Sequence, residues 1–300
     1  MIEQVRKELA SFMEQTGKSQ SQIAKETNLS TATISQFLGG IYSGDNNKIA
    51  KTLKKYLKLA QSRRNIIRTE TFYEELRNTK TALFAAEYAH TNCDIVLLSG
   101  AAGAGKTTAL KHYVENSAGV IFVTANSCAS SAMAILGEIA LKIGKIPQTK
   151  KQLLMNELVS YFKDSQRLII IDEADHLTFS ALQALRNLND ESGVGVLLSG
   201  NDKIYNQMVC GAKCGEFDQL RTRIFARPKV SNDYTIEEIQ GVFPNVDMPS
   251  TKILLEVAQT QSLRTARKLY NMSAELANAN NQKLSAAHLK RTCKQFLGVL

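Results

Sequence analysis

The chain has 300 residues, of which 44% are hydrophobic, and a formal net charge of +9. This length allows two or three domains with a sizeable core, and no apolar run reaches the ~20 residues of a membrane span. The charged N-terminus lacks the apolar segment of a signal peptide, and the five cysteines lack the spacing of a zinc site. We therefore expect a cytoplasmic protein with free thiols and no membrane partner.

Residues 1–65 are predicted to form an all-α domain of four short helices. Ser19 and Gln22 fit a capping box at the start of the second helix. Ser30 caps a third helix, which ends at Gly39. The pattern is typical of a helix-turn-helix, whose second helix enters the major groove of DNA.

In that geometry, the side chains that face DNA would be those of Thr31, Thr33, Ser35 and Gln36. None of them is an Arg or Asn, so strong sequence specificity is not expected. Residues 1–70 also contain 12 Lys and Arg against 6 Asp and Glu, which favours an anionic partner such as nucleic acid. A small helical bundle that binds protein is the alternative interpretation.

The fourth predicted helix carries a lysine stripe opposite its apolar stripe. Beside a helix-turn-helix, such a stripe favours contacts with DNA phosphates. The polar, basic segment 61–65 follows and is predicted to be a linker, which sets the domain boundary near residue 65. The lysines of the stripe are Lys48, Lys51, Lys54, Lys55 and Lys58.

A glycine-rich segment follows the apolar residues 94–99, which are predicted to form a buried strand. It has the pattern of a phosphate-binding P-loop that opens a helix, here expected from Thr108 onward. Its glycines let backbone N–H groups point at phosphate oxygens, and the helix N-terminus adds a positive dipole end. Lys106 would reach the β- and γ-phosphates of ATP, and Thr107 would bind Mg²⁺. The predicted nucleotide-binding residues of this segment are Gly100, Ala101, Ala102, Gly103, Ala104, Gly105, Lys106, Thr107 and Thr108.

Strands and helices alternate through residues 66–230. Strands that are apolar on both faces and separated by helices indicate an α/β fold, in which helices flank a parallel sheet. We therefore predict a nucleotide-binding core here. Besides the P-loop strand, it would contain strands at 120–123, 168–171 and 194–198 and helices at 71–90, 130–143 and 151–162.

The strand at 168–171 ends in two acidic residues, which is the Walker B arrangement. Asp172 would join the nucleotide-binding residues and hold the water shell of Mg²⁺, and Glu173 would polarise the attacking water as general base. The string Asp-Glu-Ala-Asp also suggests a DEAD-box helicase. Too few residues follow Asp175 to build the second RecA-like lobe of such an enzyme, so we reject this interpretation.

Two residues downstream are further candidates for catalysis. Asn201 follows the strand at 194–198 and could hydrogen-bond the attacking water or the γ-phosphate as a sensor 1 residue; a plain Gly-Asn turn is the alternative. Arg223, preferred over Arg221, is predicted to reach the γ-phosphate on a neighbouring subunit, and ordinary surface charge is the alternative.

Residues 231–300 lack predicted strands and are expected to form a helical lid. Arg264 lies at the start of its third helix, where a sensor 2 arginine would contact the nucleotide. The candidate helices are at 237–239, 253–259, 263–276 and 285–296.

These motifs together resemble an AAA+ ATPase. With an N-terminal helix-turn-helix, the chain more specifically resembles the Mu B family of activators of transposition target DNA, over nearly its whole length. The stretches that carry this resemblance are residues 29–35, 42–46, 127–130, 169–177 and 199–201.

The resemblance implies an ATP-dependent, largely non-sequence-specific binder of double-stranded DNA that assembles as a helical filament. Such proteins deliver target DNA to a DDE-type transposase and stimulate it, and the transposase triggers ATP hydrolysis. The ATP site would lie between subunits, with Arg223 acting in trans. DNA would run along basic side chains inside the filament, for which the candidates are Lys142, Lys145, Lys150 and Lys151.

Two other functions share these features. One is an AAA+ helicase loader, and the other is a nucleotide-switched helix-turn-helix transcription regulator. A regulator would protect one discrete DNA site, whereas a filament former would cover DNA without preference.

Overall fold

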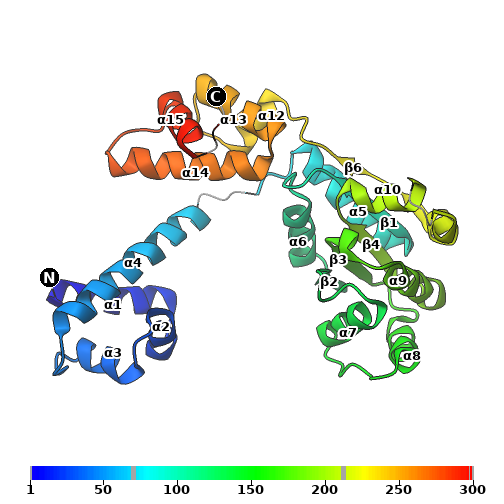
Figure 1. Ribbon diagram of the computed structural model, residues 1–300, viewed down its shortest axis with the longest axis horizontal. Coiled ribbons are helices and arrows are strands. Elements are labelled where there is room, and N and C mark those ends of the chain that lie inside the picture. The colour runs from blue at the N-terminus through cyan, green and yellow to red at the C-terminus, as the bar shows by residue number, and fades with distance from the viewer. Residues whose placement is uncertain (1, 69–71, 211–213, 297, 299–300) are drawn as a thin grey trace. The chain divides into compact units, whose positions relative to one another are not determined.

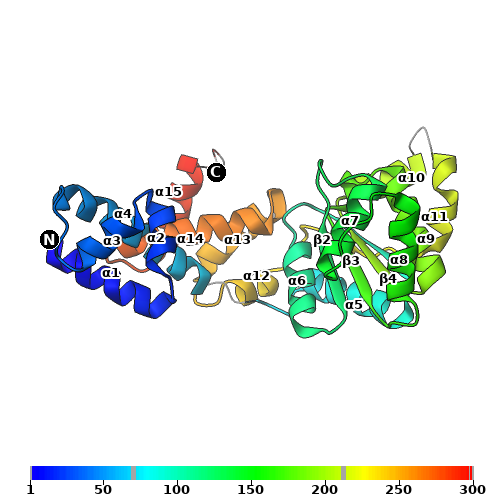
Figure 2. The same ribbon diagram turned by 90° about the horizontal axis from the view of Figure 1, so that it is seen from below.

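The computed structural model describes residues 2–68, 72–210, 214–296 and 298 (Figures 1 and 2). The chain forms two compact units, residues 1–72 and residues 73–300. Among the helices of the described ranges, none combines the length and the apolar character that a membrane crossing requires.

The N-terminal unit consists of four helices. They are α1 (Ile2–Thr16), α2 (Gln20–Thr27), α3 (Thr31–Leu38) and α4 (Asn46–Arg68). The capping predictions are confirmed, because Ser19 and Gln22 form a capping box and the Ser30 side chain accepts a hydrogen bond from the Thr33 N–H. Asn28 adopts the left-handed conformation, with a φ of 55°, and ends α2.

An apolar core holds these four helices together. Each helix contributes fully or almost fully buried side chains at helical spacing, which explains why the short helices are stable in this unit. The core includes Val5, Leu9, Ile23, Ile34, Phe37, Leu53 and Leu57. The predicted linker at residues 61–65 is wrong, because α4 continues through this segment to Arg68.

The second unit is built on a parallel β-sheet. Its strand order is β2-β3-β4-β1-β5. The short strand β6 also pairs with β1, at Ser99 and Gly100, further along β1 than the residues that pair with β5. The predicted α/β fold with a parallel sheet flanked by helices is therefore confirmed. The strands are β1 (Ile95–Gly100), β2 (Val120–Thr124), β3 (Leu168–Asp172), β4 (Gly195–Ser199), β5 (Ile224–Ala226) and β6 (Lys229–Val230).

Helices cover both faces of the sheet (Figure 2). On one face, alternate strand residues such as Ile95, Ile169 and Val196 pack with buried side chains of α7, α8 and α9. On the other face, α5 approaches β4 so closely that a Cβ on Gly195 would lie 2.2 Å from the Ala89 carbonyl oxygen. These helices are α5 (Arg77–Asn92), α6 (Lys106–Asn116), α7 (Ala132–Lys142), α8 (Lys151–Phe162) and α9 (Phe179–Ser192).

The core differs from the prediction in the starts of two helices and in several short elements. Helix α5 begins at Arg77 rather than near residue 71, and α6 begins at Lys106 rather than at Thr108. The strands β5 and β6 were not predicted, because they are only 3 and 2 residues long. After β4 the chain also forms α10 (Asp202–Cys210), a 3-10 turn at Cys214–Phe217 and α11 (Asp218–Arg223).

The C-terminal part of this unit is helical, as predicted (Figure 1). Its helices form a cluster of buried side chains separate from the cluster on the sheet, with members such as Leu254, Ala266 and Leu289. We call residues 231–296 the lid. Its helices are α12 (Ile236–Val242), α13 (Met248–Thr260), α14 (Leu263–Ala279) and α15 (Ala286–Phe296).

Candidate nucleotide site

The glycine-rich segment connects the end of β1 to the start of α6. The Lys106 ammonium donates hydrogen bonds to the carbonyl oxygens of Gly100 at 2.9 Å and Ala101 at 3.0 Å. A Cβ built on Gly105 would meet no described atom within 4 Å, so this side of the loop is open. An open loop, a helix N-terminus and an ammonium group together form an anion-binding arrangement.

The Lys106 side chain lies in a partly buried position among acidic residues. Burial lowers the pKa of its ammonium group below the usual value, while the nearby carboxylates of Asp172 and Glu173 act in the opposite direction. A buried cation gains most from an anionic ligand, because the ligand restores the interactions that water would supply. The position of Lys106 therefore suits a phosphate group.

Asp172, at the end of β3, is buried and joins three elements of the site. Its Oδ2 accepts a hydrogen bond from the Thr107 hydroxyl at 2.7 Å, and its Oδ1 accepts one from the Ser199 hydroxyl at 3.0 Å. The carboxyl ends of β3 and β4 and the first turn of α6 therefore meet at this carboxylate. Ser199 was not among the predicted site residues.

The Thr107–Asp172 pair suits Mg²⁺. Mg²⁺ in proteins keeps several water ligands, and the Asp172 carboxylate lies beside the Thr107 hydroxyl, where it could accept hydrogen bonds from such waters. Because the Thr107 hydroxyl gives its hydrogen to Asp172, its lone pairs are available to a metal ion. Thr107 could thus ligate Mg²⁺ directly, and Asp172 could hold water molecules of its shell.

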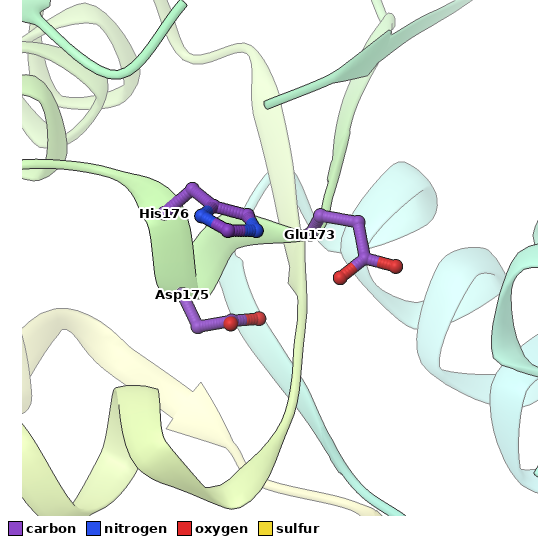
Figure 3. Close-up of side chains that lie close together, drawn as sticks. All are labelled: Glu173, Asp175 and His176. Carbon is purple, nitrogen blue, oxygen red and sulfur yellow. The ribbon is translucent and has the colours of Figure 1, made fainter. Parts of the chain in front are cut away.

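Three polar side chains gather in the loop after β3 (Figure 3). Glu173, Asp175 and His176 each offer a ligand atom, and these atoms lie within 4.8 Å of one another. Glu173 is exposed and adopts the left-handed conformation, with a φ of 54°, which directs the chain into the short 3-10 turn Ala174–His176. Left-handed non-glycine residues are uncommon and often occur at functional sites.

Asn201 follows β4 and is bound by Asp175. The Asp175 Oδ2 accepts a hydrogen bond from the Asn201 side-chain amide at 2.7 Å, and its Oδ1 accepts one from the Asn201 backbone N–H at 3.2 Å. The Asn201 Oδ1 in turn accepts from the Lys203 N–H at 2.8 Å. The predicted sensor 1 residue is therefore held in one orientation by a carboxylate of the Walker B loop.

The lid contacts the glycine-rich loop at Gly103. The Arg264 N–H donates to the Gly103 carbonyl at 3.3 Å, and a Cβ on Gly103 would lie 2.8 Å from the Ser262 Cβ and 3.2 Å from the Arg264 Cβ. Gly103 has a φ of 75°, so both its conformation and its surroundings favour glycine. The structure thus places the predicted sensor 2 residue beside the loop, with an exposed side chain.

Arg223 lies at the end of α11, immediately before β5. Its Nε pairs with the Asp190 carboxylate of α9 at 3.2 Å, and Asp190 is also 3.7 Å from Arg186. The neighbouring Arg221 pairs instead with Asp218 at 3.2 Å. The Arg223 side chain is more than half exposed, so it is accessible to another molecule.

The predicted DNA-contacting residues fall into two groups. Thr31, Ser35 and Gln36 are exposed on α3, whereas Thr33 is half-buried and its hydroxyl bonds with the N-cap Ser30. The second group surrounds the connection between α7 and α8, and all its side chains are exposed. It consists of Lys142, Lys145, Lys150 and Lys151.

Comparison with known proteins adds family information to this geometry. A family model described as an AAA domain matches residues 89–208. The chain is 26% identical over 299 residues to the "ATP-dependent target DNA activator B" of Escherichia phage Mu, covering 98% of this chain and 96% of that protein. It is 30% identical over 251 residues to the "Mu-like prophage FluMu DNA transposition protein B" of Haemophilus influenzae, covering 80% of this chain and 86% of that relative.

A solved structure of a RuvB variant from Thermotoga maritima also aligns with the chain. The alignment covers 74% of this chain and 69% of that chain, with a TM-score of 0.46 and 14% sequence identity.

Proposed function

Because the chain belongs to the Mu B family of DNA transposition proteins, we propose that it is an ATP-dependent DNA-binding ATPase that delivers target DNA to a transposase. Its AAA domain supports an ATPase, and the names of its relatives support a function in transposition. The observation that carries the proposal is the carboxylate of Asp172 between the Thr107 and Ser199 hydroxyls, next to the loop that holds Lys106.

The groups of the site have complementary roles in this proposal. Lys106 and the backbone N–H groups of residues 100–108 bind the phosphates, and Thr107 with Asp172 holds Mg²⁺, which neutralises phosphate charge. Glu173 accepts the proton of the attacking water, and Asn201 orients that water or the γ-phosphate. Arg264 contacts the nucleotide from the lid.

Arg223 completes the site from a neighbouring subunit in this proposal. Its guanidinium group is more than half exposed, and its Nε pairs with the half-buried carboxylate of Asp190. Exchange of this pair for a phosphate on another chain would leave Asp190 beside Arg186, 3.7 Å away, so its carboxylate would not lose all of its positive neighbours. A delocalised cation at the γ-phosphate stabilises the charge of the transition state.

The DNA-binding role rests on charge and exposure. The four lysines around the α7–α8 connection are exposed, and this group would follow the DNA backbone inside a helical filament without reading base sequence. The α3 residues of the N-terminal unit would add contacts in the major groove. Mutation of the four lysines should flatten the salt dependence of binding, and an unchanged slope would remove them from the proposal.

Electron microscopy of the purified protein on random-sequence duplex DNA would test the proposal. The samples would contain ATP, ADP or no nucleotide, and Lys106→Ala would be the matched variant. We expect filaments with ATP alone, lost in the variant. Discrete particles that do not depend on nucleotide would contradict the filament and favour a transcription regulator or a helicase loader.

A further inference from the structure

The connection between α7 and α8 exposes apolar side chains among its lysines. We call residues 141–153 the α7–α8 tip. Leu141 is 56% exposed, Leu153 is 51% exposed, and Ile146 is 85% exposed, the highest value among the large apolar side chains that the structure describes. Figure 1 shows this connection at one end of the sheet domain, beyond the helices that cover the sheet. An apolar group that is exposed to this degree is a candidate for contact with another molecule.

The backbone of the α7–α8 tip is fixed from within. Gly144 adopts a φ of 76° after the end of α7, and the Lys145 N–H then donates to the Ala140 carbonyl at 2.9 Å. The Pro147 ring packs against α7, since a Cβ on Gly137 would lie 3.7 Å from the Pro147 Cβ. Ile146 lies between these two fixed residues, so its binding to another molecule would cost little further backbone entropy.

Glu157 of α8 secures the other side of the α7–α8 tip. Its carboxylate lies 3.6 Å from the Lys145 ammonium and accepts a hydrogen bond from the Gln148 amide at 3.3 Å. The remaining lysines, Lys142, Lys150 and Lys151, are exposed. The tip therefore combines a fixed apolar apex with a net positive charge.

This combination favours duplex DNA over a protein as the occupant. The centres of protein–protein interfaces are depleted in lysine, whereas proteins that bend DNA place apolar wedges beside Lys and Arg that hold the phosphates. Such wedges enter a base step from the minor groove and partly unstack it. A single isoleucine between phosphate-binding lysines has this chemistry.

We propose that the α7–α8 tip is a DNA wedge, in which Ile146 inserts at a base step of the minor groove while the surrounding lysines hold the phosphates. This inference rests on the proposed DNA-binding function and adds to it a deformation of the bound duplex. A row of subunits, each inserting one apolar group, would unwind the DNA that it covers. The same wedge would favour flexible pyrimidine–purine steps, which unstack at the least cost.

The test is a linking-number measurement on relaxed, closed-circular plasmid with the full chain and ATP. Topoisomerase I is added after binding, and the topoisomers are resolved after removal of the protein. The wild-type protein and Ile146→Leu should lower the linking number in proportion to the amount of protein bound. Ile146→Ser should lose most of this shift at equal occupancy, because serine cannot unstack a base step.

Leu276→Ser is the matched control, since Leu276 is a 41% exposed leucine on α14 of the lid. It should leave the shift unchanged. DNA binding without a linking-number change in the wild-type protein would overturn the wedge and leave the proposed function intact. Absence of ATP-dependent DNA binding would instead overturn both.

Sedimentation of the free protein distinguishes the DNA wedge from a contact between subunits. If Ile146→Ser abolished self-association in the absence of DNA, as followed by sedimentation, the apolar apex would be a subunit contact and the wedge would be wrong. Self-association equal to that of the wild-type protein, together with the lost linking-number shift, would support the wedge.

Discussion

Asp175 and Asn201 are joined by two hydrogen bonds that link the loop after β3 to the end of β4. Both carboxylate oxygens of Asp175 are used, one by the backbone N–H of Asn201 and the other by its side-chain amide. The pair is also tightly packed, because a Cβ on Gly200, which directly precedes Asn201, would lie 2.8 Å from the Asp175 Oδ1. The orientation of the asparagine is therefore set by a residue that need not touch the nucleotide.

Replacement of Asp175 should slow hydrolysis more than it weakens binding. Asp175→Ala removes two hydrogen bonds of Asn201 and leaves its amide held by the Lys203 N–H, and misplacement of a catalytic group costs up to about 100-fold in rate. We expect kcat for ATP to fall about 10- to 100-fold, with little change in the dissociation constant of ADP. Asp218→Ala, which removes an exposed carboxylate paired with Arg221, is the control. An unchanged kcat for Asp175→Ala would show that the pair has no role in positioning.

Nucleotide affinity should fall as the pH rises. The pKa of Lys106 lies below its usual value in the free protein, and a bound phosphate would raise it again. Binding then takes up a proton at any pH between these two pKa values, so affinity decreases across that window. Titration of the protein with ADP by calorimetry from about pH 7 to about pH 10 would measure this decrease.

Lys106→Arg supplies the control for the pH experiment, since an arginine stays charged throughout this range. Its affinity should be weaker than that of the wild-type protein but nearly independent of pH. An equal slope in both proteins would assign the pH dependence to another group, such as the nucleotide itself.

Substitution of Gly103 should disturb the junction between the loop and the lid. Gly103→Ala forces a left-handed alanine, at about 1 kcal/mol or more, and places its Cβ against Ser262. Gly193→Ala isolates the first effect, because Gly193 has a φ of 70° and nothing described lies within 4 Å of its added Cβ. We expect Gly103→Ala to lose a further ~1–3 kcal/mol of unfolding free energy. Equal losses in chemical denaturation would contradict the packing argument.

Arg223 should act on the site of another subunit. Arg223→Ala and Lys106→Ala should each lose most ATPase activity, since an arginine at the γ-phosphate contributes about 1000-fold or more in related enzymes. A mixture of the two variants should recover activity, because some sites then combine an intact loop with an intact arginine. Arg221→Ala, which breaks only the pair with Asp218, should remain active. A mixture without ATPase activity would contradict the action of Arg223 on the site of another subunit.

The sequence alone was sufficient to predict the elements with a strong local pattern. The glycine-rich loop and the Asp172-Glu173 pair each follow an apolar strand, and the caps of α2 and α3 have their usual residues. The alternation of strands and helices along the chain was enough to predict a parallel sheet, because parallel strands require such crossover connections. The roles of the site residues stay predictions until they are measured.

Other features depend on contacts between distant residues, which no local pattern specifies. The strands β5 and β6 exist because they pair with β1, and Pro228 between them interrupts any periodic signal. Segment 61–65 has the composition of a linker yet continues α4 to Arg68, because Gln, Ser, Arg and Asn are all tolerated in a helix and a polar composition alone does not end one. Ser199 binds Asp172 across 27 positions of the chain, and the only local sign was a serine at the end of a buried strand.

The lid has its own buried core, and its backbone contacts the phosphate-binding loop at Gly103 and Arg264. A change of ligand in that loop would therefore act, through the contact of Gly103 with Arg264, on four helices that share one core. The gain or loss of a single phosphate would then change the angle between the lid and the β-sheet. In the helical row of subunits proposed above, such small angles would add from one subunit to the next, so that a chemical event in each subunit would change the pitch of the row.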